Sequence, residues 1–242
     1  MRSIPEGPTV LDVSLPLGGV TLRGELLLPP SPRGLTLLSF AGNAEQQAPP
    51  LRDVARYLRK AHYGTLLVDL LSAEQDRDDD WQQSLAFDVQ LLSDRLERAT
   101  EWLLGSVAGM YGRVALVGVG TAAAAALVAS VRLGDAVRAV ATIDGRVDLA
   151  GGALDWVTAH TLLLVAGRDD PTLLVTRAAV HALRGRGTLE VISGADALGA
   201  ERWALHAAAH SARDWFERYL PRIETGMVAS PERDARPHDL RT

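Results

Sequence analysis

The 242-residue sequence contains no cysteine. This absence excludes disulfide bonds, thiolate metal ligands and a cysteine nucleophile. No segment approaches the roughly 20 consecutive apolar residues of a membrane-spanning helix, and the N-terminal residues include no apolar run of signal-peptide length. The formal net charge is −5 and the arginines are scattered, so the clustered basic residues typical of nucleic-acid-binding proteins are missing. From these absences we expect a cytoplasmic protein that binds neither nucleic acid nor a membrane.

The residues that are present have the composition of an ordinary globular domain, with 47% hydrophobic and 23% charged side chains. The length suits one large α/β domain with a substantial core. We assign residues 9–222 to that domain and residues 1–8 to an N-terminal extension. Residues 223–242 are polar and lack hydrophobic periodicity, so we expect a disordered tail there.

Hydrophobic periodicity predicts the order of the secondary-structure elements. Alternation of apolar and polar residues around Leu17-Gly-Gly19 predicts an antiparallel hairpin of residues 9–16 and 20–28. Continuous apolar runs predict buried strands, and apolar residues at helical spacing predict helices. Strands are expected at residues 35–40, 65–68, 113–118, 137–143, 161–166 and 188–193, and helices at residues 50–60, 82–104, 121–133, 172–184 and 202–220. Because strands alternate with helices, we expect an α/β fold with a mostly parallel, twisted sheet, an N-terminal antiparallel hairpin and helices on both faces.

The most informative segment joins the strand at 113–118 to an alanine-rich helix. α/β-Hydrolases place their catalytic serine at such a junction, in a strained G-x-S-x-G turn that exposes the hydroxyl. The five corresponding residues here are Gly118, Val119, Gly120, Thr121 and Ala122. Gly120 therefore occupies the position of the nucleophile, and glycine has no side chain that could attack a substrate. The hydroxyl of Thr121 lies one residue past the tip, where we expect it to cap the following helix.

From about residue 10 to residue 220, the order and spacing of the motifs resemble those of the dienelactone hydrolase-like group of the α/β-hydrolase superfamily. The motifs are the Gly18–Pro29, Gly64–Leu71 and Asp144–Ala150 segments. The resemblance implies an α/β-hydrolase fold. It also places Asp169, which ends the segment Val165-Ala-Gly-Arg-Asp169, at the position of the triad acid.

The sequence departs from the family's pattern at the other catalytic positions. Relatives carry the histidine base two residues after a Gly-Ala pair, whereas this chain reads Gly194-Ala-Asp-Ala197, so Ala197 replaces the base. Relatives also carry His-Gly and a loop of small residues that lends an N–H to the oxyanion hole, whereas this chain reads Ala41-Gly-Asn-Ala-Glu-Gln-Gln47. With the nucleophile and the base both absent, Asp169 has no histidine to orient.

We therefore expect a non-hydrolytic pseudoenzyme with a binding, scaffold or regulatory role. Its partner would be a small molecule in the ancestral pocket or another protein, and a homo-oligomer is compatible with the sequence. No cofactor or metal ion is expected. The pocket should lie where the carboxyl ends of the strands meet, as in other open α/β sheets. Its candidate residues are Ala41, Gly42, Asn43, Gly118, Val119, Gly120, Thr121, Asp144 and Asp169.

Two alternative functions remain open. In the first, a residual or remodelled hydrolase would use Asp169 with water or a relocated base to cleave ester or lactone bonds. In the second, Gly118-x-Gly120-x-x-Ala123 is a dinucleotide fingerprint whose acidic residue is Asp144, 26 residues after Gly118. We rank nucleotide binding lower, because the motif follows an internal strand and the resemblance already accounts for a tight glycine turn.

Two further clusters suggest metal binding only weakly. His206 and His210 are spaced i, i+4 on the last predicted helix, but no third ligand is evident nearby. The acidic run Glu74–Asp80 lacks the glycine and the closing glutamate of a calcium-binding loop. We expect exposed helical histidines in the first case and a solvated loop before a helix in the second.

Overall fold

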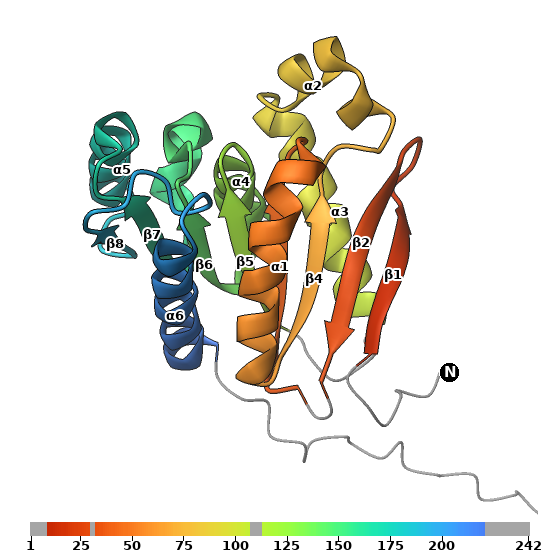
Figure 1. Cartoon of the computed structure of the whole chain (residues 1–242), viewed down its shortest axis with the longest axis horizontal. Coiled ribbons are helices and arrows are strands. Elements are labelled where there is room, and N and C mark those ends of the chain that lie inside the picture. The colour runs from red at the N-terminus through yellow and green to blue at the C-terminus, as the bar shows by residue number, and fades with distance from the viewer. Residues whose placement is uncertain (1–8, 30–31, 107–112, 221–242) are drawn as a thin grey trace, which may run out of the picture.

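The computed structural model describes residues 9–29, 32–106 and 113–220 (Figure 1). The predicted N-terminal extension, residues 1–8, and the predicted tail, residues 223–242, lie outside the described residues. The described residues form a central sheet with helices on both faces, which confirms the predicted fold class.

Eight strands of the described chain form one sheet, in the spatial order β1-β2-β4-β3-β5-β6-β7-β8. The pairs β1–β2 and β2–β4 are antiparallel, whereas every pair from β4–β3 to β7–β8 is parallel. The strands are β1 (Thr9–Pro16), β2 (Thr21–Leu28), β3 (Gly34–Phe40), β4 (Tyr63–Asp69), β5 (Val114–Val119), β6 (Val137–Ile143), β7 (His160–Ala166) and β8 (Gly187–Ile192). Because the strands from β3 to β8 are parallel, the loops that follow them gather at one end of the sheet.

Helices pack on both faces of the sheet (Figure 1). On one face lie α1 (Ala44–Lys60) and α6 (Arg202–Tyr219), and on the other α3 (Val89–Ser106), α4 (Ala122–Leu133) and α5 (Asp170–Ala182). The short α2 (Asp79–Leu85) lies above the carboxyl end of β4, and 3-10 segments form at η1 (Gln75–Arg77), η2 (Gly134–Ala136) and η3 (Val147–Trp156). None of the described helices is both long and apolar enough to cross a membrane.

The central strands are buried on both faces because alternate residues enter two apolar layers. In β5, Val114 and Leu116 belong to the cluster formed with α3 and α4. Their neighbours Ala115 and Val117 belong to the cluster formed with α1 and α6. This arrangement explains why the strands are continuous apolar runs in the sequence.

The start of α1 corrects the sequence prediction. The helix begins at Ala44, six residues before the predicted start, and contains both Pro49 and Pro50. Prolines lack the N–H that would bond to the preceding turn, so the local pattern favours a helix that begins at them. The earlier turn forms because the N–H groups of Asn43 and Ala44 bond to the carboxylate of Asp76, a partner more than 30 residues away.

The predicted helix of residues 82–104 is also corrected, because it is two helices. α2 ends at Leu85 and α3 begins at Val89. Asp88 stands at the break, and its Oδ1 accepts a hydrogen bond from the N–H of Leu91 at 3.0 Å, as the cap of a new helix does. Beyond the break, Leu92, Leu96 and Leu103 lie on the buried side of α3, as their spacing predicts.

Candidate functional site

The turn between β5 and α4 contains two glycines that are required for different reasons. A Cβ atom on Gly118 would lie 2.5 Å from the carbonyl oxygen of Ala122 and 2.6 Å from the Cα of Ala123, so a side chain would prevent this close approach of strand and helix. Gly120 has a φ of +57°, in the left-handed region. A Cβ atom on Gly120 would meet no atom within 4 Å. The turn therefore has the shape of a nucleophile elbow whose tip projects into open space.

The backbone of the tip is anchored on the end of β6. The Gly120 N–H donates to the carbonyl of Ile143 at 3.4 Å, and the Gly120 carbonyl accepts from the N–H of Arg146 at 2.9 Å. Thr121 has helical dihedral angles and its hydroxyl makes no cap bond, so the predicted capping role is wrong. Val119 is half-buried and packs against the apolar cluster of α1 and α6.

The loop after β3 lies next to the elbow, because β3 and β5 are neighbouring strands. The N–H of Gly42 donates to Oδ1 of Asp69 at 2.9 Å. The N–H of Asn43 donates to Oδ1 of Asp76 at 2.6 Å, and the N–H of Ala44 donates to Oδ2 of the same residue at 3.3 Å. Three consecutive amides in the region that would supply an oxyanion-hole donor are thus bonded to carboxylates. The preceding residue, Ala41, is buried in the apolar cluster of α3 and α4.

Asp69 is a site residue that the sequence analysis missed. It ends β4, and its Oδ1 also accepts the N–H of Leu71 at 2.9 Å. Burial raises the pKa of this carboxyl to about 6, the two backbone N–H bonds oppose the rise, and nearby Asp76 adds to it. The guanidinium of Arg95 lowers the pKa less than burial raises it. The sequence feature that could have identified Asp69 is that it is the single charged residue of its strand and stands at the strand's carboxyl end.

Asp144 follows β6 and links the ends of the neighbouring strands. It has a φ of +44°, unusual for a residue with a side chain. Its Oδ1 accepts the N–H of Ala166 at 2.9 Å, and its Oδ2 accepts the N–H of Leu198 at 2.6 Å. Burial raises the pKa of Asp144, and the nearby charge of Asp169 raises it further. Both carboxylate oxygens are therefore used within the fold.

Asp169 and Ala197 follow β7 and β8 at the same end of the sheet as Gly120. Asp169 is the N-cap residue of α5, and its Oδ1 accepts the N–H of Thr172 at 3.2 Å. Ala197 is half-exposed and precedes Leu198, whose N–H is bonded to Asp144. The structure thus gathers the predicted positions 120, 144, 169 and 197 along the ends of β5 to β8.

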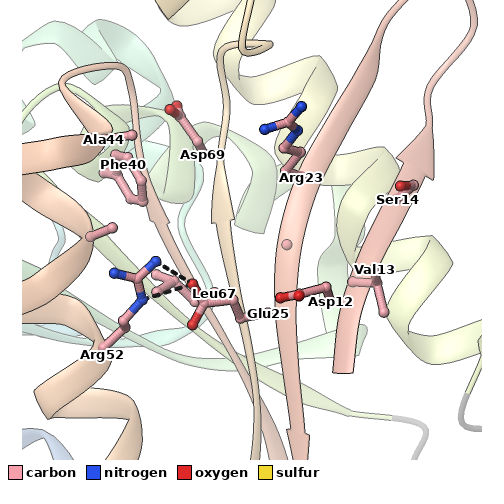
Figure 2. Close-up of a pocket in the computed structure, with 12 residues that line it drawn as sticks. Asp12, Val13, Ser14, Arg23, Glu25, Phe40, Ala44, Arg52, Leu67 and Asp69 are labelled. Carbon is pink, nitrogen blue, oxygen red and sulfur yellow. Dashed lines mark hydrogen bonds and ion pairs between the residues drawn. The ribbon is translucent and has the colours of Figure 1, made fainter. Parts of the chain in front are cut away.

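A cavity lies on the α1 face of the sheet, toward β1 and β2 (Figure 2). Its volume is about 520 Å³, and its walls come from β1, β2, β4, the end of β3 and α1. Arg52 of α1 donates to Oε1 of Glu25 across it, with Nε at 2.7 Å. Figure 2 shows Arg23 and Asp69 at one end, on adjacent strands, as the pairing of Gly24 with Val68 requires.

A second cavity, of about 320 Å³, shares Arg23, Ala44 and Asp69 with the first and extends along the loop after β4. Neither cavity is lined by the predicted pocket residues at 41–43, 118–121 and 144 or by Asp169. A ligand pocket above Gly120 therefore stays a prediction, whereas Asp69 connects the amide of Gly42 to a cavity of ligand size.

The two side-chain clusters that weakly suggested metal binding make contacts within the fold. His206 and His210 lie beside the ring of Tyr57, with centroid distances of 5.3 Å and 6.3 Å. In the acidic run, Asp76 bonds to the start of α1. Within residues 9–29, 32–106 and 113–220, no three His, Cys, Asp or Glu side chains are grouped to hold a metal ion.

Solved structures of dienelactone hydrolases and esterases resemble this chain. A dienelactone hydrolase from Anabaena variabilis is 37% identical, with 88% of this chain and 99% of that chain covered and a TM-score of 0.81. A dienelactone hydrolase-like promiscuous phosphotriesterase from metagenomic libraries is 17% identical, with the same coverage and a TM-score of 0.68. An esterase domain from Rhodothermus marinus is 16% identical, again with 88% and 99% covered, and has a TM-score of 0.69.

The sequence comparisons add a longer type of relative. Two Mycobacterium tuberculosis proteins, provisionally named phosphoribosyl transferases, are 36% identical over 209 residues, which is 86% of this chain and 46% of theirs. The chain therefore spans about half the length of the curated relatives it matches. No protein-family model matches the sequence.

Proposed function

Because the chain belongs to the dienelactone hydrolase-like group of the α/β-hydrolase superfamily, we propose that it is a non-hydrolytic member, a pseudoenzyme with a binding, scaffold or regulatory role. The observation that carries this proposal is the geometry of Gly120. A hydrolase of this fold presents its nucleophile from a left-handed residue at the tip of the elbow. Here that residue has the expected backbone and free space above it, but it is a glycine.

The occupied amides after β3 support the proposal independently. An oxyanion hole accelerates acyl transfer because its N–H groups point at the oxygen on which negative charge develops, and the loss of one donor lowers kcat by about 10²–10³. The N–H groups of Gly42, Asn43 and Ala44 already donate to carboxylates. A carboxylate beside them would also repel a second negative charge.

The remaining triad positions agree with this interpretation. The carboxylate of Asp169 caps α5 through Thr172, a role that needs no catalytic partner. Ala197 has only a methyl group at the position of the base, and a methyl group cannot accept a proton. We infer that Asp169 persists for the stability of α5.

A binding role is supported by the cavity of Figure 2. Its volume of about 520 Å³ falls within the range of small-molecule sites. Arg23 offers a cation there, and Asp69 offers a carboxyl group that can be neutral or charged near neutral pH. We propose a small polar molecule as the ligand, held beside the former catalytic end of the sheet rather than above Gly120.

A scaffold role is supported by the longer relatives. In the mycobacterial proteins, a segment similar to this chain is joined to about as much sequence again. A domain that occurs beside another in one chain is well suited to act through a partner. A protein that transfers phosphoribosyl groups is the partner class that the name of those relatives suggests.

The geometry favours the two rival functions less. A nucleotide at the Gly118-x-Gly120 turn would need Asp144 to accept from a ribose hydroxyl, but both oxygens of Asp144 are bonded to backbone N–H groups. A remodelled hydrolase would need Asp169 and a base in contact with water above Gly120. Among the described residues, no imidazole bonds to Asp169.

The test is hydrolysis of a panel of activated esters and lactones by the purified full chain. We expect turnover no faster than in buffer, and the same result for Asp169→Asn. Turnover that the Asp169→Asn substitution abolishes would contradict the proposal and identify a remodelled hydrolase.

A matched double variant, Gly120→Ser with Ala197→His, examines the elbow itself. We expect it to fold, because space is free above Gly120, and to show at most weak ester turnover, because the amides after β3 remain occupied. Robust turnover by this variant would show that the amides do not limit catalysis. Failure to fold would contradict the assignment of Gly120 as the tip.

A further inference from the structure

A third cavity, of about 230 Å³, lies between α1 and α6 on the near face of the sheet in Figure 1. All of its lining residues come from the last turns of α1 and the first half of α6. It shares no residue with the two cavities near Asp69. The proposed function does not use this place.

The charge around this cavity is unlike that of the whole chain. The sequence carries a net charge of −5, yet four cationic side chains line the cavity, namely Arg56, Arg59, Lys60 and Arg202. Lys60 is the single lysine of the sequence. The one carboxylate in the lining, Asp53, forms an ion pair with Arg56. The cavity is therefore a local positive site on an acidic protein.

Helix electrostatics explain only part of this cluster. Arg59 and Lys60 lie in the last turn of α1, where cations favour the helix dipole. Arg202 is the first residue of α6, where a cation opposes the dipole and an anion would be favoured. A bound anion between the two helices would be attracted by the net positive charge of the lining and would favour the dipole of α6.

Aromatic and apolar side chains form part of the cavity wall. The hydroxyl of Tyr57 accepts a hydrogen bond from Nη1 of Arg213 at 3.1 Å, and the guanidinium of Arg213 lies 5.6 Å from the centre of the ring. His206 packs edge-on against the same ring, at 5.3 Å. Leu205 is buried. A few polar groups beside apolar side chains are typical of a small-molecule site.

We propose that the cavity between α1 and α6 binds a compact polyanion, a small molecule that carries a diphosphate or two phosphate groups. Arginine binds phosphate oxygens through paired N–H donors, and lysine binds them as a point charge. With Asp53 paired to Arg56, three further cations remain in the lining, and they suit a ligand with several negative charges rather than a single carboxylate. The volume is below the 300 Å³ or so of typical ligand sites, which favours a diphosphate group over a whole dinucleotide.

The test titrates inorganic diphosphate into the full chain and follows backbone amide and histidine ring signals by NMR. We expect saturable shifts in α1, α6 and the ring of His206, with weaker binding at high ionic strength. In the double variant Lys60→Met with Arg202→Gln, the Kd should rise about tenfold for each charged hydrogen bond lost. Both side chains are exposed, so the variant should fold.

The matched control is Arg113→Gln with Arg177→Gln, which removes the same charge from exposed arginines outside this cavity. We expect its Kd for diphosphate to equal that of the unchanged chain. Three results would each overturn the proposal: no saturable shifts with millimolar diphosphate, an equal loss in the control, or tighter binding of a polyglutamate peptide than of diphosphate at these residues. The last result would identify a surface for an acidic protein.

Discussion

At the scale of single residues, the glycines of the elbow show how position decides what a side chain would do. Gly118 touches the backbone of α4, whereas Gly120 faces open space from a left-handed conformation. Their sequence pattern, G-x-G, does not distinguish these roles. The order of motifs along the chain sufficed to place Gly120, Asp169 and Ala197 after neighbouring strands of the sheet. It could not foresee that Asp69 and Asp76 would bond to the amides of Gly42 and Asn43, since these partners are 27 and 33 residues apart.

The two glycines should therefore respond differently to substitution. Gly118→Ala should lower the free energy of unfolding by about 3 kcal/mol, because the new methyl group overlaps backbone atoms that cannot move aside easily. Gly120→Ala should cost about 1–2 kcal/mol, the price of a left-handed conformation alone. Urea unfolding at one pH measures both.

Gly105 in α3 offers the control for these variants. An added Cβ there meets nothing within 4 Å, and the residue lies within a helix. Because Gly105 is the last residue but one of α3, Gly105→Ala should raise stability by at most about 0.5 kcal/mol. Equal destabilisation by Gly118→Ala and Gly120→Ala would show that the strand end and α4 are not in close contact.

At the scale of elements, periodicity predicted all eight strands and the helices that pack on the sheet, because a buried face leaves a regular apolar pattern. The errors lie at helix ends, because apolar periodicity does not mark the residue at which a helix begins or ends. The start of α1 and the break before α3 both depend on aspartate side chains, Asp76 and Asp88, that satisfy N–H groups at a helix terminus. Only the cap at Asp88 is local in sequence.

The first turn of α1 should depend on Asp76. Asp76→Ala leaves the N–H groups of Asn43 and Ala44 without this acceptor, so we expect a loss of about 1–2 kcal/mol of stability and faster amide exchange at residues 43–47. Hydrogen exchange followed by mass spectrometry resolves this segment.

Two further variants serve as controls for Asp76→Ala. Asp76→Asn keeps a carbonyl oxygen for the N–H of Asn43 and should lose less stability than Asp76→Ala. Asp80→Ala removes an exposed carboxylate of α2 and should leave exchange in α1 unchanged. If all three variants exchange alike at residues 43–47, Asp76 does not hold the start of α1.

At the scale of the whole molecule, the free energy of unfolding should depend on pH through buried carboxyl groups. Asp69 has its pKa raised to about 6, mainly by burial, from a value near 3.8 in the unfolded chain. Between these values the folded state binds more protons than the unfolded state, so stability falls as pH rises. Asp144 contributes with the same sign, because its pKa is also raised.

We expect the chain to lose about 2 kcal/mol of stability between pH 4 and pH 6 through Asp69. Asp69→Asn keeps an oxygen that can accept the N–H groups of Gly42 and Leu71 but cannot ionise. It should therefore flatten the pH dependence and stabilise the chain at pH 7. Urea unfolding across this pH range measures the slope.

The control for the slope is Asp135→Asn, which removes a carboxylate whose side chain is 95% exposed. We expect that variant to follow the unchanged chain at every pH. A slope that persists undiminished in Asp69→Asn would assign the pH dependence to other groups.

The row of three amides after β3 has a consequence for any return of this chain to chemistry. A reacting oxygen would compete for these donors with the carboxylates of Asp69 and Asp76, which accept all three N–H groups. Restoring a serine and a histidine would leave that competition unresolved. Reactivation would first require freeing these N–H groups, so the chain would lose stability before it gained any catalytic activity.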